Sequence, residues 1–168
     1  MYIYDESTSR QVIWSAQINW SRPLAFSLRQ RNYILSHVPH ERGVYCIYSK
    51  NHTFGYFSAE WPTQRWSSVI YLGSGWLDSR LFAHLHYQRN DLLCGYLNRT
   101  DLAYRYAKIA DSEDFDWPRL VESGLLGLFE HRFGQLPPCN RRRETFPDIP
   151  LDRFTVRQSP NFDYLSRG

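Results

Sequence analysis

Residues 43–49 have the sequence Gly-Val-Tyr-Cys-Ile-Tyr-Ser, which is rich in the β-branched and aromatic residues that favour strands. A second run of this kind, Ser-Val-Ile-Tyr-Leu-Gly, occupies residues 68–73. Between them, residues 49–68 predict a long loop, because glycine, proline and polar side chains interrupt any alternating pattern. We expect two consecutive strands joined by such a loop to form an antiparallel pair.

Further elements are expected after this pair, because apolar side chains recur first at helical and then at strand spacing. They are a helix over Trp76–Gln88 that Asp91–Leu97 continues after a break, a strand over Leu102–Ala110, and a helix from Asp116 to about Phe133. The last helix has Pro118 in its first turn and Gly134 as its stop signal. This order predicts an α+β fold with a small three-stranded antiparallel sheet flanked by helices.

The pattern divides the chain into three parts. Residues 1–37 are expected to be an N-terminal extension, with a short strand over Gln11–Ile18 and a helix over Arg22–Leu35. Residues 38–142 are expected to form the main domain. Residues 143–168 contain three prolines and no clear period, so they predict an extended C-terminal extension.

Composition limits the classes of partner and compartment. The 168 residues carry a net charge of +3, which permits a nucleic-acid partner without demanding one. Only Lys50 and Lys108 are lysines; the arginine that dominates suits bidentate phosphate contacts, although a GC-rich genome explains it equally well. Three widely separated cysteines argue against a disulfide scaffold or a cysteine zinc site and fit a reducing cytoplasm. The first residues lack a signal-peptide pattern, and no apolar run is long enough to span a membrane.

A series of residues in fixed order accompanies the two predicted strands. Gly43-Val44-Tyr45 and Tyr71-Leu72-Gly73 are a pair of similar triplets, and Pro39 lies just ahead of the first. The residues that follow them are Arg80, His84 four positions later, Glu122 early in the last helix, and Asn140 after a pair of prolines. This series resembles the GIY-YIG nuclease family, and the resemblance covers about residues 38–142.

The resemblance implies a role for each residue of the series. The implied roles are active-site tyrosines for Tyr45 and Tyr71, the catalytic arginine for Arg80, a base or water-orienting group for His84, the ligand of Mg²⁺ (or Mn²⁺) for Glu122, and completion or support of the site for Asn140. The residue chemistry is suitable, since Arg80 and His84 share a helix face and a glutamate is a hard oxygen ligand for magnesium. Glu130 on the same helix is the alternative metal ligand.

The implied activity is that of a divalent-metal-dependent endonuclease that hydrolyses phosphodiester bonds of DNA. A restriction or phage-defence enzyme in the cytoplasm is the expected type. RNA stays open as a substrate, and a homodimer is expected where both strands of a duplex are cut. Two alternatives stand beside this one: a structure-specific repair nuclease, and a catalytically inactive nucleic-acid-binding module of the same fold.

Two further groups of residues are candidates for contact with nucleic acid. Trp61, Arg65 and Trp66 lie in the predicted loop between the strands, where they could stack on bases or pack on the sheet as a lid. Arg141, Arg142 and Arg143 directly follow Asn140. We expect this arginine run to contact phosphates, although a solvated charge run is the other interpretation.

Overall fold

The centre of the protein is a four-stranded antiparallel sheet in the order β2-β7-β3-β6. The computed structural model describes residues 3–5, 18–58, 61–86, 90–109, 116–141 and 154–156. The strands of this sheet are β2 (Leu24–Phe26), β3 (Arg42–Ser49), β6 (Val69–Trp76) and β7 (Leu102–Lys108). The strand β3 pairs with both β6 and β7 along its length, so the first predicted strand is central.

The predicted α+β class is seen, but the prediction of a three-stranded sheet is wrong. All three predicted strands are present, and β2 is the additional one, paired with the outer edge of β7. It lies where a helix over residues 22–35 was expected. Pro23 suits the start of a strand, and Phe26 is buried with its ring against Tyr104. Pairing with the open edge of β7 outweighs helix propensity here, so helical structure begins later, with η1 (Leu28–Gln30) and α1 (Arg31–His37).

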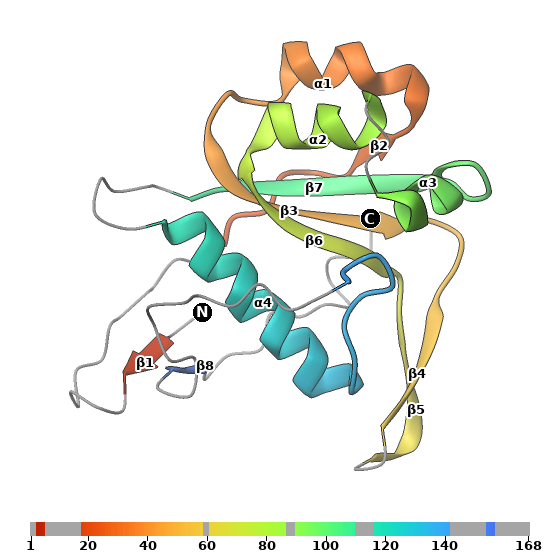
Figure 1. The fold of residues 1–168 in the computed structure, drawn as a ribbon, viewed down its shortest axis with the longest axis vertical. Coiled ribbons are helices and arrows are strands. Elements are labelled where there is room, and N and C mark those ends of the chain that lie inside the picture. The colour runs from red at the N-terminus through yellow and green to blue at the C-terminus, as the bar shows by residue number, and fades with distance from the viewer. Residues whose placement is uncertain are drawn as a thin grey trace.

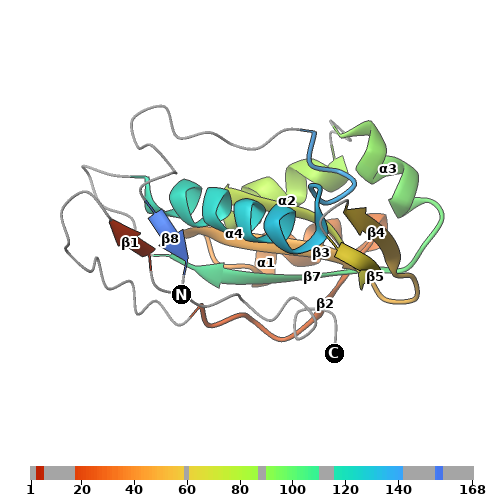
Figure 2. The ribbon, with the colours of Figure 1, turned by 90° about the horizontal axis from the view of Figure 1, so that it is seen from below.

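Helices cover both faces of this sheet (Figure 1). The helices α1 and α2 (Leu77–His86) pack together on one face, and α4 (Trp117–Phe133) crosses the other face, as Figure 2 shows from below. The side chains of β3 alternate between the two layers, so Tyr45 joins the core under α2 while Val44 joins the core under α4. A residue on β3 therefore meets a helix whichever way it points.

The segment between the two motif strands is a hairpin, so the prediction of a long loop over residues 49–68 is wrong. Its strands are β4 (Phe54–Ser58) and β5 (Trp61–Ser67), and they extend away from the main sheet (Figure 1). Tyr56 anchors the hairpin, because it is buried with its ring beside Phe129 and Phe133 of α4. The glycine and the proline that suggested a loop are accommodated within an exposed two-stranded ribbon.

The later helices follow their predicted signals closely. The helix α3 (Asp91–Leu97) has the predicted bounds, and α4 begins after Asp116, whose side chain accepts the amide of Arg119. Gly134 ends α4 in the left-handed region, at φ 77°. No helix in the described ranges is long and apolar enough to cross a membrane.

The two ends of the chain meet in a short pair of strands. The strand β1 (Ile3–Asp5) pairs antiparallel with β8 (Phe154–Val156). Of the strand expected over Gln11–Ile18, all but Ile18 lies outside the described residues, and Ile18 is in no strand. The rest of the predicted C-terminal extension also lies outside them.

Candidate active site

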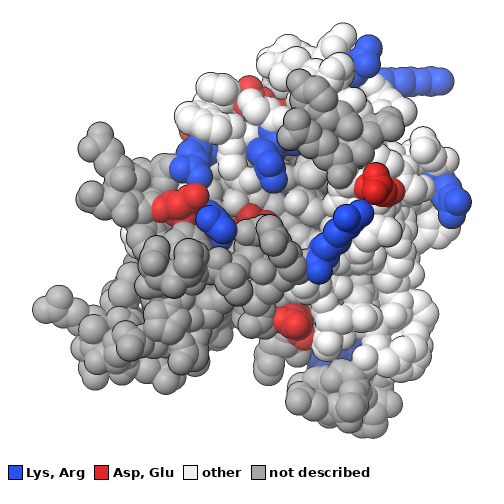
Figure 3. Space-filling view, viewed as in Figure 1, with Lys and Arg blue, Asp and Glu red and all other residues white. Residues whose placement is uncertain are grey.

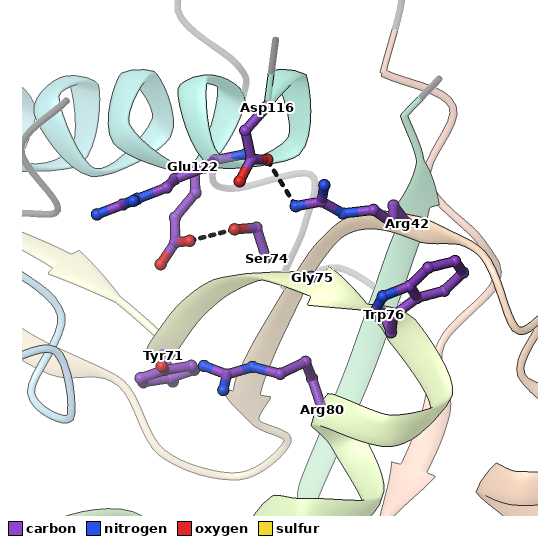
Figure 4. A pocket seen from close by; sticks show the side chains of 9 residues that line it. Arg42, Tyr71, Ser74, Gly75, Trp76, Arg80, Asp116 and Glu122 are labelled. Atoms are coloured by element: carbon purple, nitrogen blue, oxygen red, sulfur yellow. Dashed lines mark hydrogen bonds and ion pairs between the residues drawn. The ribbon is translucent and has the colours of Figure 1, made fainter. Parts of the chain in front are cut away.

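A pocket of about 310 Å³ opens where the outer edge of β6 meets the first turns of α2 and α4 (Figure 4). Three of the residues expected from the sequence line it, namely Tyr71, Arg80 and Glu122. They come from a strand, from the helix on one face of the sheet and from the helix on the other face. The remaining lining residues are Arg42, Ser74, Gly75, Trp76, Asp116 and Arg119.

Tyr45 lies behind this pocket and is fully buried. Its hydroxyl oxygen is 2.8 Å from Nε2 of His84, and its ring centroid is 6.0 Å from that of Tyr71. Arg80 donates a hydrogen bond to the same oxygen. The phenol oxygen has two lone pairs, so it can accept from Arg80 whichever way the hydrogen bond with His84 runs.

The glycines of the two triplets are required by close packing. A Cβ atom on Gly73 would lie 2.5 Å from the hydroxyl oxygen of Tyr45, and a Cβ atom on Gly43 would lie 2.2 Å from the carbonyl oxygen of Ala107. Any side chain at Gly73 would therefore displace the tyrosine that contacts Arg80. This contact gives a physical reason for the glycine in the second triplet.

The protein surroundings determine the protonation states of Tyr45 and His84. Burial, and then the nearby Tyr71, raise the pKa of Tyr45 well above its ordinary value, so it stays protonated. Burial and then the positive charge of Arg80 lower the pKa of His84 to about 4, so the imidazole is neutral at neutral pH. The two tyrosines and Glu122 raise the pKa of Arg80 against the opposing effect of burial, with Tyr45 the largest influence. The guanidinium is therefore a permanent cation at the pocket.

Glu122 places a carboxylate in the pocket from α4. It is buried, with 7% of its surface exposed, and its Oε2 accepts a hydrogen bond of 2.5 Å from the hydroxyl of Ser74 on β6. Glu130, the alternative ligand, lies two turns further along α4 and does not line the pocket. Of the two glutamates, Glu122 is therefore the better candidate for the metal ligand.

The donor set suits a cation that retains most of its water. Within the described ranges, no group of three or more histidine, cysteine, aspartate or glutamate side chains converges. A single carboxylate beside a hydroxyl is nevertheless compatible with Mg²⁺, which binds one or two carboxylates and completes its shell with waters and substrate oxygens. The residues present fit a hydrated magnesium ion and do not fit a closed zinc site.

Asn140 lies outside the pocket lining and supports the strand that carries Tyr71. Its side-chain carbonyl accepts the amide of Leu72 at 3.0 Å, and its side-chain nitrogen donates to the carbonyl of Leu72 at 2.8 Å. The amide of Cys139 also donates to the carbonyl of Ile70. Residues 139 and 140 therefore cover the outer edge of β6.

Of the residues expected to contact nucleic acid, those that the structure describes do not line the pocket. Arg141 forms an exposed ion pair with Asp91 at 3.5 Å, and Arg142 and Arg143 lie outside the described residues. On the hairpin, Trp66 is 53% exposed, and Arg65 donates to the main-chain carbonyl of Arg132 at 2.9 Å. The side chain of Trp61 also lies outside the described part of the chain.

Residues 65 and 66 of the hairpin line a second hollow with the end of α4. Its volume is about 350 Å³, and Arg132 and Phe133 complete the lining. This hollow lies at the opposite end of α4 from the turn that carries Glu122. The hairpin therefore presents its arginine and tryptophan beside α4 and is not a lid over the pocket.

Several pocket residues were not predicted from the sequence. Arg42 pairs with Asp116 at 2.7 Å across the upper part of the pocket in Figure 4, although Asp116 was predicted only as a helix cap. A weak signal existed for Arg119, which is three residues before Glu122 and so shares its helix face. Figure 3 shows acidic and basic groups gathered around this part of the surface.

Chemically, the pocket combines a permanent cation with a buried carboxylate and a tyrosine. Such a set can hold a phosphate group and a hydrated cation together. No family model, curated protein or solved structure significantly matches the chain.

Proposed function

We propose that the protein is a divalent-metal-dependent endonuclease of the GIY-YIG type, which hydrolyses phosphodiester bonds of DNA. The observation that carries this proposal is the convergence of Arg80 and Glu122 on one pocket. They come from helices on opposite faces of the sheet, and Tyr71 lies with them in the lining. A chance likeness of the sequence to the nuclease motif would not require these residues to meet.

Arg80 is assigned to the phosphate. Its guanidinium reaches the pocket, donates to Tyr45 and stays charged, so it can hold a non-bridging oxygen as negative charge grows in the transition state. The buried tyrosine fixes the direction of the guanidinium. His84 is hydrogen-bonded to Tyr45 and its ring packs edge-on against that of Tyr71, so we assign it to positioning these two tyrosines.

Tyr71 and Glu122 are assigned to the other side of the phosphate. Tyr71 lines the pocket and orients the attacking water, and Glu122 holds the cation with its carboxylate fixed by Ser74. A bound Mg²⁺ would supply Lewis-acid stabilisation of the phosphate and lower the pKa of a coordinated water. The absence of a disulfide at Cys46, Cys94 and Cys139 supports the cytoplasm as the proposed location.

The test is cleavage of plasmid, single-stranded DNA and RNA across a titration of Mg²⁺ and Mn²⁺. We expect Glu122→Gln and Arg80→Ala each to lower the rate by about 10² or more, because each removes a charge used in the transition state. High Mn²⁺ should partly restore Glu122→Gln and should not restore Arg80→Ala. Calorimetry should show that Mg²⁺ affinity falls in Glu122→Gln alone.

Glu130→Gln is the matched control, since it removes the same charge from the same helix outside the pocket. It should cut at the wild-type rate, and circular dichroism should confirm that all variants fold. A well-folded Glu122→Gln protein with the wild-type rate would disprove the metal assignment. A wild-type protein that binds DNA and cuts none of the three substrates in either metal would instead be the inactive binding module.

A further inference from the structure

The proposed reaction uses only one half of the pocket. Tyr71, Arg80 and Glu122 lie on one side in Figure 4, and Trp76 lies on the other with the Arg42–Asp116 pair. Arg119 also belongs to the lining. All of these residues line the same pocket as the proposed catalytic residues.

Trp76 forms a prepared aromatic surface at the rim. Its indole ring is stacked on the ring of His40, with centroids 4.6 Å apart and an angle of 15° between the planes. The imidazole is in turn fixed by Asp78, whose Oδ2 is 2.9 Å from its Nδ1. Even so, 47% of the tryptophan surface is exposed. A large aromatic side chain that is held rigid and left half exposed is suited to stacking with another ring.

A guanidinium group lies beside this ring. It belongs to Arg42, which lines the pocket with Trp76 and pairs with Asp116. The 2.7 Å ion pair holds the Arg42 side chain in place. A fixed guanidinium next to an aromatic ring is a combination that can bind a nucleotide, because phosphate and base are recognised separately.

We propose that this half of the pocket is a subsite for one unstacked nucleotide. The base lies on Trp76, and its phosphate lies beside Arg42. Inside a duplex both faces of each base are covered by its neighbours, so a base can reach such a ring only after leaving the stack. The subsite therefore assigns a substrate class: DNA with an unpaired or mismatched nucleotide next to the scissile phosphate. The location of the scissile phosphate next to this nucleotide rests on the proposed function.

The first experiment measures binding and does not depend on cleavage. The full chain carrying Glu122→Gln is titrated with a short oligothymidylate and with an oligomer of the same length built from abasic residues. We expect the thymidylate to bind at least about fivefold more tightly, since base stacking contributes at this scale. Adding Trp76→Ala should abolish the difference, and adding Trp76→Phe should retain part of it. Adding Leu92→Ala, which removes an exposed apolar side chain from α3, should leave the difference unchanged.

A second experiment measures cleavage. The wild-type chain should cut a duplex that contains a single mismatch faster than a fully paired duplex, and Trp76→Ala should remove this preference. Equal affinity for the two oligomers, or an equal loss with Trp76→Ala on both, would overturn the subsite. If base-dependent binding requires Trp76 while no nucleic acid is cut in Mg²⁺ or Mn²⁺, the nuclease proposal fails and the nucleotide subsite stands.

Discussion

At the scale of single residues, burial decides what each candidate side chain can do. His84 was expected to be a base or a water-orienting group, and its position four residues after Arg80 is on the same helix. It does not line the pocket; it shares a hydrogen bond with the fully buried Tyr45, and its ring packs edge-on against that of Tyr71. Sequence spacing gave the helix face correctly but held no information on the depth of the side chain. Of these two residues, Arg80 is therefore the one that lines the pocket.

The partly buried imidazole of His84 makes stability depend on pH. The pKa of His84 is about 4 in the folded protein, lower than the usual value of about 6.5 in an unfolded chain. Its contribution is complete above about pH 6.5 and is lost as the pH falls toward 4, since the unfolded chain then binds a proton that the folded chain excludes. The shift corresponds to about 3 kcal/mol, as an upper limit for a side chain that is not fully buried.

Urea unfolding at a series of pH values between neutrality and pH 4 measures this loss. We expect the free energy of unfolding of the wild type to fall more steeply over this range than that of His84→Gln. The other five of the six histidines are common to both proteins, so their effects cancel in the comparison. Parallel curves for the two proteins would show that folding does not lower the pKa of His84.

At the scale of secondary structure, the elements with local signals were predicted well. The helix α4 has its cap at Asp116 and its stop at Gly134, and β3 has an apolar pattern on both faces. The two errors, at β2 and at the hairpin, share a cause. The strand β2 forms because β7 offers an open edge, and β4 and β5 are held by Tyr56 against α4. Both depend on partners distant in sequence, which propensity does not report.

The close contact between β6 and Tyr45 allows a test at this scale. Gly73→Ala would place a methyl group 2.5 Å from the hydroxyl oxygen of Tyr45. Because fully buried side chains cannot move far, we expect a loss of about 1–3 kcal/mol in stability. We also expect nearly complete loss of cleavage, because Tyr45 no longer directs Arg80. Thermal unfolding and plasmid cleavage measure the two effects.

Gly124→Ala is the matched control for this substitution. It makes the same chemical change inside α4, where an added Cβ atom meets nothing within 4 Å. Alanine is the better helix former, so this variant should gain about 0.5–1 kcal/mol in stability and keep its activity. If Gly73→Ala is as active and as stable as Gly124→Ala, Tyr45 does not have the position described.

At the scale of the whole molecule, the pocket exists because β6 is an edge strand. Tyr71 is grouped with the core under α2, whereas Ser74 pairs with Val44, whose side chain joins the core under α4. Only at the edge of a sheet can residues from both faces reach one pocket. The sequence could name Tyr71, Arg80 and Glu122 one by one through their order. It could not reveal Trp76 or Arg42, whose role depends on this edge.

The same architecture predicts how much DNA the protein contacts. Glu122 in the pocket and Phe133 beside Trp66 lie on one helix. Eleven residues of helix separate them by about 16 Å, which equals the rise of about five base pairs of duplex. DNA lying along α4 from the pocket therefore reaches the exposed Trp66 after about that length. Affinity should rise in a step when a duplex is extended past it.

Competition binding with duplexes of increasing length, each against the full chain carrying Glu122→Gln, measures this step. The wild-type hairpin should show it, and Trp66→Ala should remove it while leaving the affinity for the shortest duplexes unchanged, because these end before the hairpin. Leu35→Ala is the control, since Leu35 is 49% exposed on α1, across the sheet from α4. It should keep the step. If Trp66→Ala lowers the affinity equally at every duplex length, the hairpin lies beside the cleavage site. If Trp66→Ala leaves the affinity unchanged at every length, the hairpin is not part of the DNA-binding surface.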